Sequence, residues 1–366
     1  MEQAETPNNS ALPYFPNLDG LRFISFAIVF FSHGIVGTTG LLEDYNYLAF
    51  TGLDFFFVLS AFLITHRLLS EQKVKGKISL KRFIYRRSLR VWPLYFLTVF
   101  VGFCLHAYAL RSEMSPEPLP PLWTFMTFTV NFWMANHGTS FLFFMVFLWS
   151  ICLEEQFYSM LGILMRFASK LLVPVCSLMV AVSLWFRFEF QSQSLQLLYN
   201  SLSLMGAFGV GSLAAWIGFN FKERICNLFA DSGVFWTLFY GGFILNLVFF
   251  PIWYNDFPWS LLDRPILWFF MAFVIIGQCL PSKVFIPMGY FSSFRYLGKI
   301  SYGMYIFHGV FILLLLKAPI SFEAGGFYQV FMRPLLIFAL TVLVASISFY
   351  YFEKPFLKLK ARLSGV

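Results

Sequence analysis

Charged residues are scarce in this sequence: aspartate, glutamate, lysine and arginine make up only 12% of 366 residues. A soluble domain carries about 25% charged residues, so this scarcity excludes an ordinary soluble enzyme or binding module. Hydrophobic residues instead reach 59%, and phenylalanine alone fills 51 positions. Apolar runs of about 20 residues, which is long enough to cross a bilayer, recur along the chain. The composition predicts an all-α, polytopic transmembrane helix bundle.

Paired cysteines are also missing, because the five cysteines are scattered and lie mostly in apolar segments. This spacing excludes a disulfide framework and a zinc-binding motif, and we expect no metal site. The first 18 residues hold no lysine or arginine, so no basic region precedes the first apolar run. Because no small-residue cleavage site follows that run, we expect a retained span rather than a removed signal peptide.

Ten apolar segments predict about ten membrane spans. Their approximate ranges are 22–40, 48–68, 91–110, 140–165, 171–188, 200–219, 233–252, 264–281, 300–317 and 333–352. A further apolar segment, 122–136, is short, and it is either a re-entrant or interfacial piece or an eleventh span.

The positions of the basic residues predict the orientation. If the N-terminus is cytoplasmic, most of the 26 lysines and arginines fall on the cytoplasmic side. Such an excess is typical of cytoplasmic loops, so we expect both termini inside the cell. The net charge of +8 would then face cytoplasm and anionic lipid, which argues against a nucleic-acid partner. We treat residues 1–366 as a single membrane domain with a polar tail at 1–18 and a basic tail at 353–366.

Arg22 and His33 form the most informative pair in the chain. Eleven residues separate them, which is close to three helical turns, so both should face the same way about 16 Å apart. A histidine inside a membrane is costly unless it faces a polar cavity. Alternatively, His33 could be a helix-packing residue and Arg22 a residue that extends toward the membrane surface. The pair predicts a cavity that admits an anion and carries out chemistry on it.

A basic stripe leads into the third span. Arg82, Arg86 and Arg90 have i, i+4 spacing, and Arg87 lies beside them. The stripe could be an interfacial helix on anionic lipid, or a clamp for phosphates, which guanidinium groups bind well. The two roles are compatible.

Carboxylates inside apolar segments are the next candidates. Glu154 and Glu155 are adjacent in mid-span, where packing alone hardly explains them. They point about 100° apart on a helix, so at most one faces a given cavity, and Glu154 shares a face with Tyr158. Asp54, near the outer end of the second span, could orient a cation or donor across the cavity, or could be a capping or interfacial residue.

The last candidates lie near the C-terminus. Tyr302 and His308 belong to the segment that opens the ninth span, and His308 is a second intramembrane histidine. Glu353 ends the tenth span next to Lys354, where we expect a surface ion pair or a helix-end role.

These segments, in this order, resemble the acyltransferase 3 family of integral membrane acyltransferases. The resemblance covers nearly the whole chain, and Ala61 and Cys152 depart from the family pattern, which usually has glycine and Ser or Ala there. The matching positions are Arg22 with His33, 52–65, 86–95, 148–158, 297–308 and 351–355.

The resemblance implies a bacterial cytoplasmic-membrane enzyme that transfers an acyl group, often acetyl from acyl-coenzyme A (acyl-CoA). The acceptor would be a hydroxyl of a surface polysaccharide, a lipid-linked glycan or a secreted metabolite. Some relatives carry a fused extracytoplasmic esterase-like domain. We expect no room for such a domain in this sequence, so any esterase-like partner is expected to be a separate protein. The implied catalytic residues are His33 and Glu154, the donor-handling residues are Arg22, Arg86, Arg87 and Arg90, and the substrate or polar-core residues are Asp54, Tyr158, Tyr302 and His308.

The alternative from another class is a transporter or flippase that moves a glycan or acyl group without catalysis. Buried charges and a basic mouth fit that function equally well. Transporters often show two similar halves, and no such repeat is visible in this sequence. A binding-only regulator fits less well still.

Overall fold

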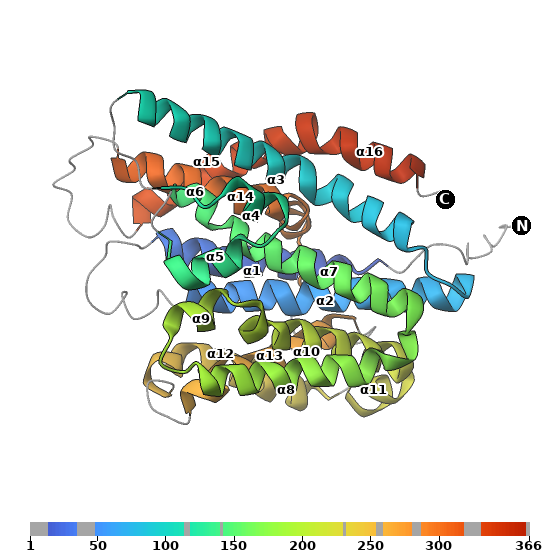
Figure 1. Cartoon of the computed structure of the whole chain (residues 1–366). Helices are drawn as coiled ribbons and strands as arrows, with labels where there is room; N and C mark the ends of the chain where they lie inside the picture. Colours follow the sequence, from blue (N-terminus) through green and yellow to red (C-terminus); the bar gives the residue numbers. More distant parts are fainter. Residues whose placement is uncertain are drawn as a thin grey trace, which may run out of the picture.

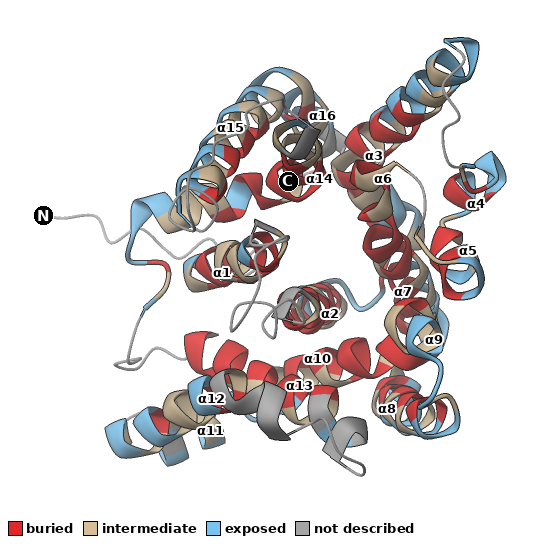
Figure 2. Ribbon diagram, turned by 90° about the vertical axis from the view of Figure 1, so that its left-hand side faces the viewer, coloured by how far each residue is buried: buried red, intermediate tan, exposed pale blue. Residues whose placement is uncertain are grey.

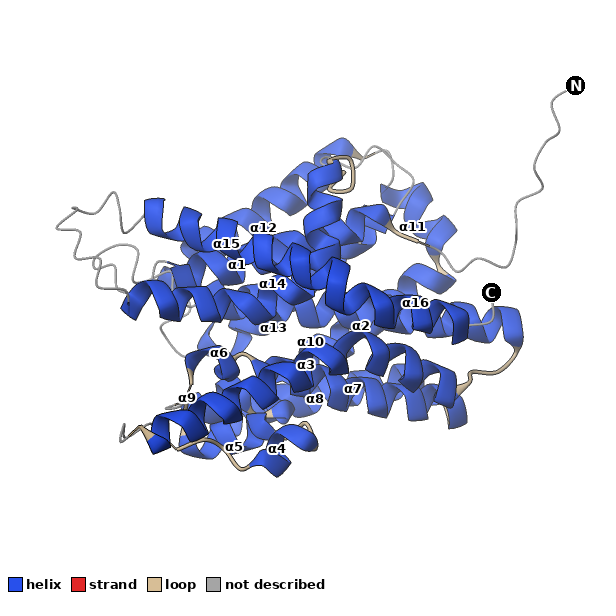
Figure 3. Ribbon diagram, turned by 90° about the horizontal axis from the view of Figure 1, so that it is seen from above, coloured by secondary structure: helices blue, strands red, loops and turns tan. Residues whose placement is uncertain are grey.

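The computed structural model describes residues 14–34, 48–112, 118–139, 142–229, 232–253, 259–279, 287–317 and 331–363. Throughout these residues the regular structure is helical, with no strand (Figure 3). The all-α fold predicted from composition is therefore confirmed for the part of the chain that the structure describes.

Two helices, α1 (Pro16–Gly34) and α2 (Leu48–Lys75), lie side by side at the centre of the bundle (Figures 1 and 2). Helices α14 (Ser292–Lys317) and α15 (Arg333–Ser348) pack on one another beside α1. On the other side, α10 (Ser201–Asn220) and α13 (Trp259–Cys279) pack against α2. The longer surrounding helices are α3 (Leu80–Arg111), α7 (Leu148–Phe167), α8 (Leu172–Glu189), α10 (Ser201–Asn220), α12 (Gly233–Trp253), α13 (Trp259–Cys279), α14 (Ser292–Lys317) and α15 (Arg333–Ser348). The shorter elements are α4 (Leu122–Met126), α5 (Val130–His137), α6 (Phe143–Val146), η2 (Ser169–Leu171), α9 (Ser194–Tyr199), α11 (Lys222–Phe229), η4 (Phe349–Glu353) and α16 (Lys354–Leu363).

Small residues let the central helices approach closely, as is typical of helix packing in membranes. A Cβ at Gly52 of α2 would lie 2.7 Å from the carbonyl oxygen of Ser25 in α1. On the other side of α2, a Cβ at Gly211 of α10 would overlap the carbonyl oxygen of Val58 and lie 2.9 Å from Ala61. The glycine of that contact therefore belongs to α10, which explains how α2 accommodates alanine at position 61.

Fewer of the described helices are long and apolar enough to span a membrane than the ten spans that the sequence predicts. Every one of the ten predicted segments overlaps a helix, but only six helices among the described residues are long and apolar enough to cross a membrane. The number rises to seven if α11 and α12 count as one bent span. The ten-span topology and the cytoplasmic position of both termini stay predictions.

Several predicted boundaries were wrong. The third span was predicted to begin at 91, but α3 begins at Leu80, because the basic stripe continues the same helix. The range 140–165 is divided between α6 and α7. Residues 35–40 of the first predicted span lie outside the described residues.

The segment 122–136 forms two short helices, α4 and α5, of 5 and 8 residues. At 1.5 Å per residue, neither reaches across the roughly 30 Å of a bilayer core, which favours the re-entrant or interfacial interpretation. Between them Phe128 has a φ of 55°, and its carbonyl oxygen accepts a 2.6 Å hydrogen bond from Gln156 Nε2. Asn131 also bonds Gln156, so α7 holds this segment in place.

Candidate functional site

A cavity of about 300 Å³ lies between α1, α2 and α3, and we call it the arginine cavity. Five arginines line it against only two carboxylates, so it suits an anion. Its lining residues are Tyr14, Phe15, Leu18, Asp19, Arg22, Leu63, Ile64, His66, Arg67, Leu68, Glu71, Phe83, Arg86, Arg87 and Arg90.

A smaller cavity of about 90 Å³ lies next to it, and we call it the tyrosine cavity. The two cavities share three lining residues, namely Arg22, Arg87 and Arg90. The other residues that line the tyrosine cavity are Leu53, Phe56, Phe57, Ser60, Val91, Ser150, Ile151, Glu154, Tyr158, Ser301, Tyr302 and Tyr305. An anion held by the shared arginines would therefore have a narrow, tyrosine-lined space directly beyond it.

Helix α3 supplies three of the arginines that line the cavities. Arg86, Arg87 and Arg90 lie one helical turn or less apart, so all three reach the cavities. Arg82, the first member of the predicted stripe, lines neither cavity among the described residues. Its backbone N–H instead donates to the capping hydroxyl of Ser79 at 3.4 Å.

Two acids that the sequence analysis missed hold these arginines. Arg22 donates to Asp19 at 2.7 Å, and Tyr14 donates to the other oxygen of Asp19 at 2.6 Å. Partial desolvation of its hydroxyl, together with the hydrogen bond to Asp19 and the charge of that carboxylate, raises the pKa of Tyr14 to about 12, so this hydroxyl stays a donor at neutral pH. Arg86 lies 3.6 Å from Glu71. The i, i+3 spacing of Asp19 and Arg22 was visible in the sequence and could have identified the first pair.

Gly298 of α14 keeps the backbone of Asp19 in place. A Cβ at this position would overlap the Asp19 carbonyl oxygen, whereas a Cβ at Gly303 of the same helix would meet its nearest atom at 3.1 Å. We therefore expect Gly298→Ala to destabilise the protein by about 1–3 kcal/mol, the usual cost of overpacking, and to weaken anion binding at Arg22. Thermal unfolding in detergent is the measurement, and Gly303→Ala, which should cost less, is the control. Equal unfolding temperatures for the two variants would contradict the tight contact.

The tyrosine cavity contains a hydrogen-bonded carboxylate. Glu154 accepts from Tyr158 one turn later in α7 and from Ser60 of α2, the latter at 3.4 Å. The guanidinium of Arg87 lies 3.9 Å from the centre of the Tyr158 ring. The expected shared face of Glu154 and Tyr158 is confirmed. Glu155 points elsewhere and accepts from Trp92 at 2.9 Å, as the 100° separation requires.

The two intramembrane histidines lie together, with ring centres 5.5 Å apart. Phe147 contacts both, at 4.9 Å from His33 and 4.3 Å from His308. His308 Nδ1 lies 2.7 Å from the carbonyl oxygen of Tyr305, which can only accept, so this nitrogen carries a proton. In the neutral ring, Nε2 is then unprotonated, and it is buried without a partner among the described residues. Tyr305 also lines the tyrosine cavity, so it connects that cavity to the histidines.

The other two candidates near the C-terminus, Tyr302 and Glu353, are placed differently from one another. Tyr302 lines the tyrosine cavity and donates to the carbonyl oxygen of Val91 at 2.7 Å, which ties α14 to α3. For Glu353 we expected a surface ion pair or a helix-end role; the surface position is wrong, whereas Glu353 does end the helical turn η4. Glu353, in the π-helical turn η4, is only 8% exposed, and its carboxylate lies against Gly303 of α14.

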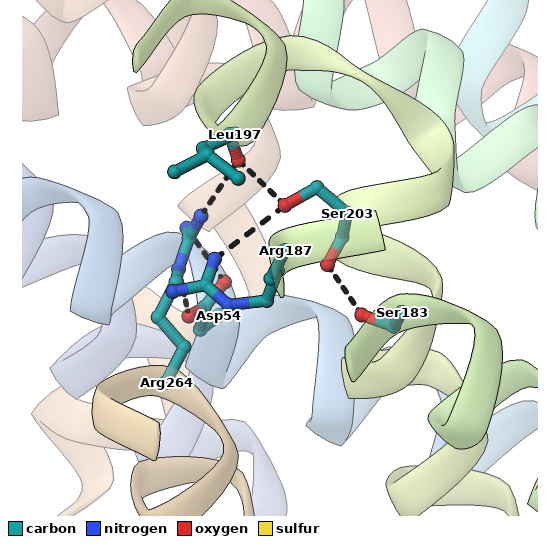
Figure 4. Close-up of polar contacts among 6 residues, drawn as sticks. All are labelled: Asp54, Ser183, Arg187, Leu197, Ser203 and Arg264. Atoms are coloured by element: carbon teal, nitrogen blue, oxygen red, sulfur yellow. Dashed lines mark hydrogen bonds and ion pairs between the residues drawn. The ribbon is translucent and has the colours of Figure 1, made fainter. Parts of the chain in front are cut away.

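Asp54 is not among the residues that line either cavity, and it is completely buried. Arg264 of α13 donates to both of its oxygens, from Nε at 2.7 Å and from Nη2 at 2.9 Å. The same guanidinium reaches the carbonyl oxygen of Leu197 at 3.4 Å, to which Ser203 also donates (Figure 4). The alternative that placed Asp54 at the membrane interface is therefore wrong. Asp54 does orient a cation, and that cation is the Arg264 side chain of the protein itself.

Removing one partner of this buried pair should be costly. We expect Asp54→Asn to destabilise the protein by about 3–5 kcal/mol, because Arg264 keeps a buried charge without its carboxylate. The double variant Asp54→Leu/Arg264→Met should be less destabilised, since it removes both charges. Denaturant unfolding of purified protein would compare them, and an Asp54→Asn variant as stable as the wild type would refute the structural role.

Within the described ranges, no group of three or more His, Cys, Asp or Glu side chains is arranged to hold a metal ion.

The chain belongs to the acyltransferase 3 family, whose acyltransferase-domain profile matches residues 15–353. It is 26% identical to the putative peptidoglycan O-acetyltransferase YrhL of Bacillus subtilis, over 93% of this chain and 55% of that protein. It is 25% identical to the O-acetyltransferase OatA of Staphylococcus aureus, over 94% of this chain and 57% of that protein. The chain therefore spans a little more than half the length of these relatives. No solved structure matches it significantly.

Proposed function

We propose that this protein is a membrane O-acetyltransferase that takes an acetyl group from cytoplasmic acetyl-CoA and passes it to a hydroxyl of a cell-envelope glycan. The observation that carries the proposal is the set of arginines shared by the two cavities. Arg22, Arg87 and Arg90 face both the wide, cationic cavity and the narrow one beyond it. A donor with a polyanionic head and a thin reactive arm has the matching shape.

The length of the donor also fits. Arg22 and His33 belong to the single helix α1, and eleven residues at 1.5 Å each separate them by about 16 Å. With the diphosphate on the shared arginines, the pantetheine arm would run through the tyrosine cavity toward the histidines. Guanidinium groups bind phosphate oxygens with paired hydrogen bonds, which favours the arginines over any neutral site.

In the proposed reaction, His33 acts as a general base. Its neutral imidazole takes the proton of the acceptor hydroxyl, whose oxygen forms the new ester bond with the thioester carbonyl carbon. The carbon–sulfur bond breaks, and the departing thiolate takes the proton from the imidazolium to give coenzyme A. Formation of an acyl-histidine intermediate is the other route open to the same residue.

We assign positioning roles to the neighbouring groups. His308, whose ring lies 5.5 Å from that of His33 and whose Nε2 is buried without a partner among the described residues, would hold the His33 ring by accepting a hydrogen bond from it. Glu154 would orient Tyr158 and Ser60 and offset the charge of Arg87 along the path of the donor arm.

The test is a transfer assay with purified protein in lipid vesicles, radiolabelled acetyl-CoA and a membrane glycan fraction. The proposal predicts label in alkali-labile esters on sugar. Label that crosses the membrane without forming an ester would instead establish the transporter alternative.

A further inference from the structure

We infer that a third cavity receives the phosphorylated nucleotide end of the acyl-CoA donor, an inference that rests on the proposed function. This cavity of about 270 Å³, which we call the lysine cavity, is reached from the arginine cavity past two shared residues, Phe15 and His66. The remaining lining residues are Phe62, Ser70, Lys73, Gly218, Phe219, Lys222, Ile225, Ile276 and Cys279.

The charges of the lysine cavity suit a terminal phosphate. Lys73 and Lys222 line it, and none of its lining residues is acidic. A lysine ammonium is a compact, mobile point charge that can follow a terminal phosphate, while arginine forks suit the bridged diphosphate. Coenzyme A carries its negative charge in two such groups, a diphosphate and a ribose 3′-phosphate. The protein presents two cationic groups in the same order, with arginines toward the reaction centre and lysines beyond them.

The rings between the two cavities suit a flat base. His66 packs edge-on against Phe15 at 5.1 Å and against Phe219 at 5.4 Å, and it is stacked with Phe62 at 6.0 Å. Phe219 also lies 5.6 Å from Lys73 Nζ. A purine base stacks favourably on such aromatic faces, whatever its hydrogen-bonding edge. Adenine among these rings would place the ribose phosphate beside the two lysines.

The two sites therefore divide the donor between them. The arginine cavity would hold the diphosphate, and the lysine cavity would recognise the adenosine 3′-phosphate, which is remote from the reacting thioester. Recognition at such a distance strengthens donor binding without changing the chemical step. It also predicts selection against donors that share the pantetheine thioester but lack the 3′-phosphate.

The experiment compares CoA with dephospho-CoA on wild-type protein in phosphatidylcholine vesicles, by equilibrium binding and by transfer from their acetyl thioesters. One charge-assisted phosphate contact corresponds to about tenfold to a hundredfold in affinity, so the wild type should prefer CoA by that factor. The double variant Lys73→Met/Lys222→Met should lose this preference, with weaker binding of CoA and unchanged binding of dephospho-CoA. Lys75→Met, an exposed lysine on the same helix outside the cavity, is the matched control.

Each other outcome contradicts a defined part of the account. The nucleotide site is overturned if the wild type binds CoA and dephospho-CoA with equal affinity, or if the double variant loses the same factor of affinity for both. If acetyl transfer continues in either case, the proposed function still stands. Phosphatidylglycerol vesicles provide a further outcome. If they inhibit CoA binding, and the double variant relieves this inhibition without changing the preference for CoA over dephospho-CoA, the lysines bind a lipid phosphate and the nucleotide site is overturned. Failure of the wild type to bind either compound overturns the proposed donor, and this site with it.

Discussion

Replacing His33 by alanine is expected to abolish acyl transfer while the protein still folds and binds its donor. A general base contributes about 10²–10⁴-fold to a rate, so residual activity should fall to 1% or less. Donor binding should persist because the arginines lie about three turns away and do not contact the imidazole. The measurement is the transfer rate at saturating donor, together with donor binding by the same preparation.

His106→Ala is the matched control for this variant. His106 also has a buried ring nitrogen, but it belongs to α3 and lines neither cavity within the described chain. It should retain most of the activity. Full activity of His33→Ala would refute both the general-base route and the acyl-histidine route, since both need the same ring.

The second large effect is expected at Arg90, which lines both cavities from α3. Arg90→Leu should weaken acyl-CoA binding by about tenfold to a hundredfold, because it removes a charge-assisted contact to phosphate. The change should appear mainly in KM, with a smaller effect on kcat, since the arginine is remote from the thioester. Steady-state kinetics across donor concentrations separate the two parameters.

Arg82→Leu distinguishes a phosphate clamp from a lipid-binding stripe. Arg82 lies on the same helix, two turns before Arg90, and lines neither cavity in the described residues. If the arginines bind the donor, only Arg90→Leu should raise KM. If both variants behave alike and respond to anionic lipid, the interfacial interpretation of the stripe is correct.

Local spacing predicted much of the site. The separation of Arg22 and His33 and the shared face of Glu154 and Tyr158 follow from the geometry of one helix each, so sequence alone sufficed. The same geometry correctly separated Glu154 from Glu155. Ion pairs close in sequence, such as Asp19 with Arg22, were equally accessible but were overlooked.

Contacts between distant segments could not be predicted in this way. Asp54 meets Arg264 across 210 positions, and nothing in either local pattern marks the other. His33 and His308 were both recognised as intramembrane histidines, yet only the packing of α1 on α14 brings their rings together. Glu353 was misplaced for a similar reason, because a π-helical turn rotates it toward Gly303 instead of the surface.

The most direct test of the account uses membrane vesicles of known orientation, with acetyl-CoA supplied on one side only. The central claim is that the donor enters through the arginine cavity, on the face that the basic residues predict to be cytoplasmic, and reaches His33 from there. Inside-out vesicles should therefore transfer label from external acetyl-CoA to the glycan, while sealed right-side-out vesicles should not. Equal transfer in both orientations, or transfer only in right-side-out vesicles, would contradict the claim.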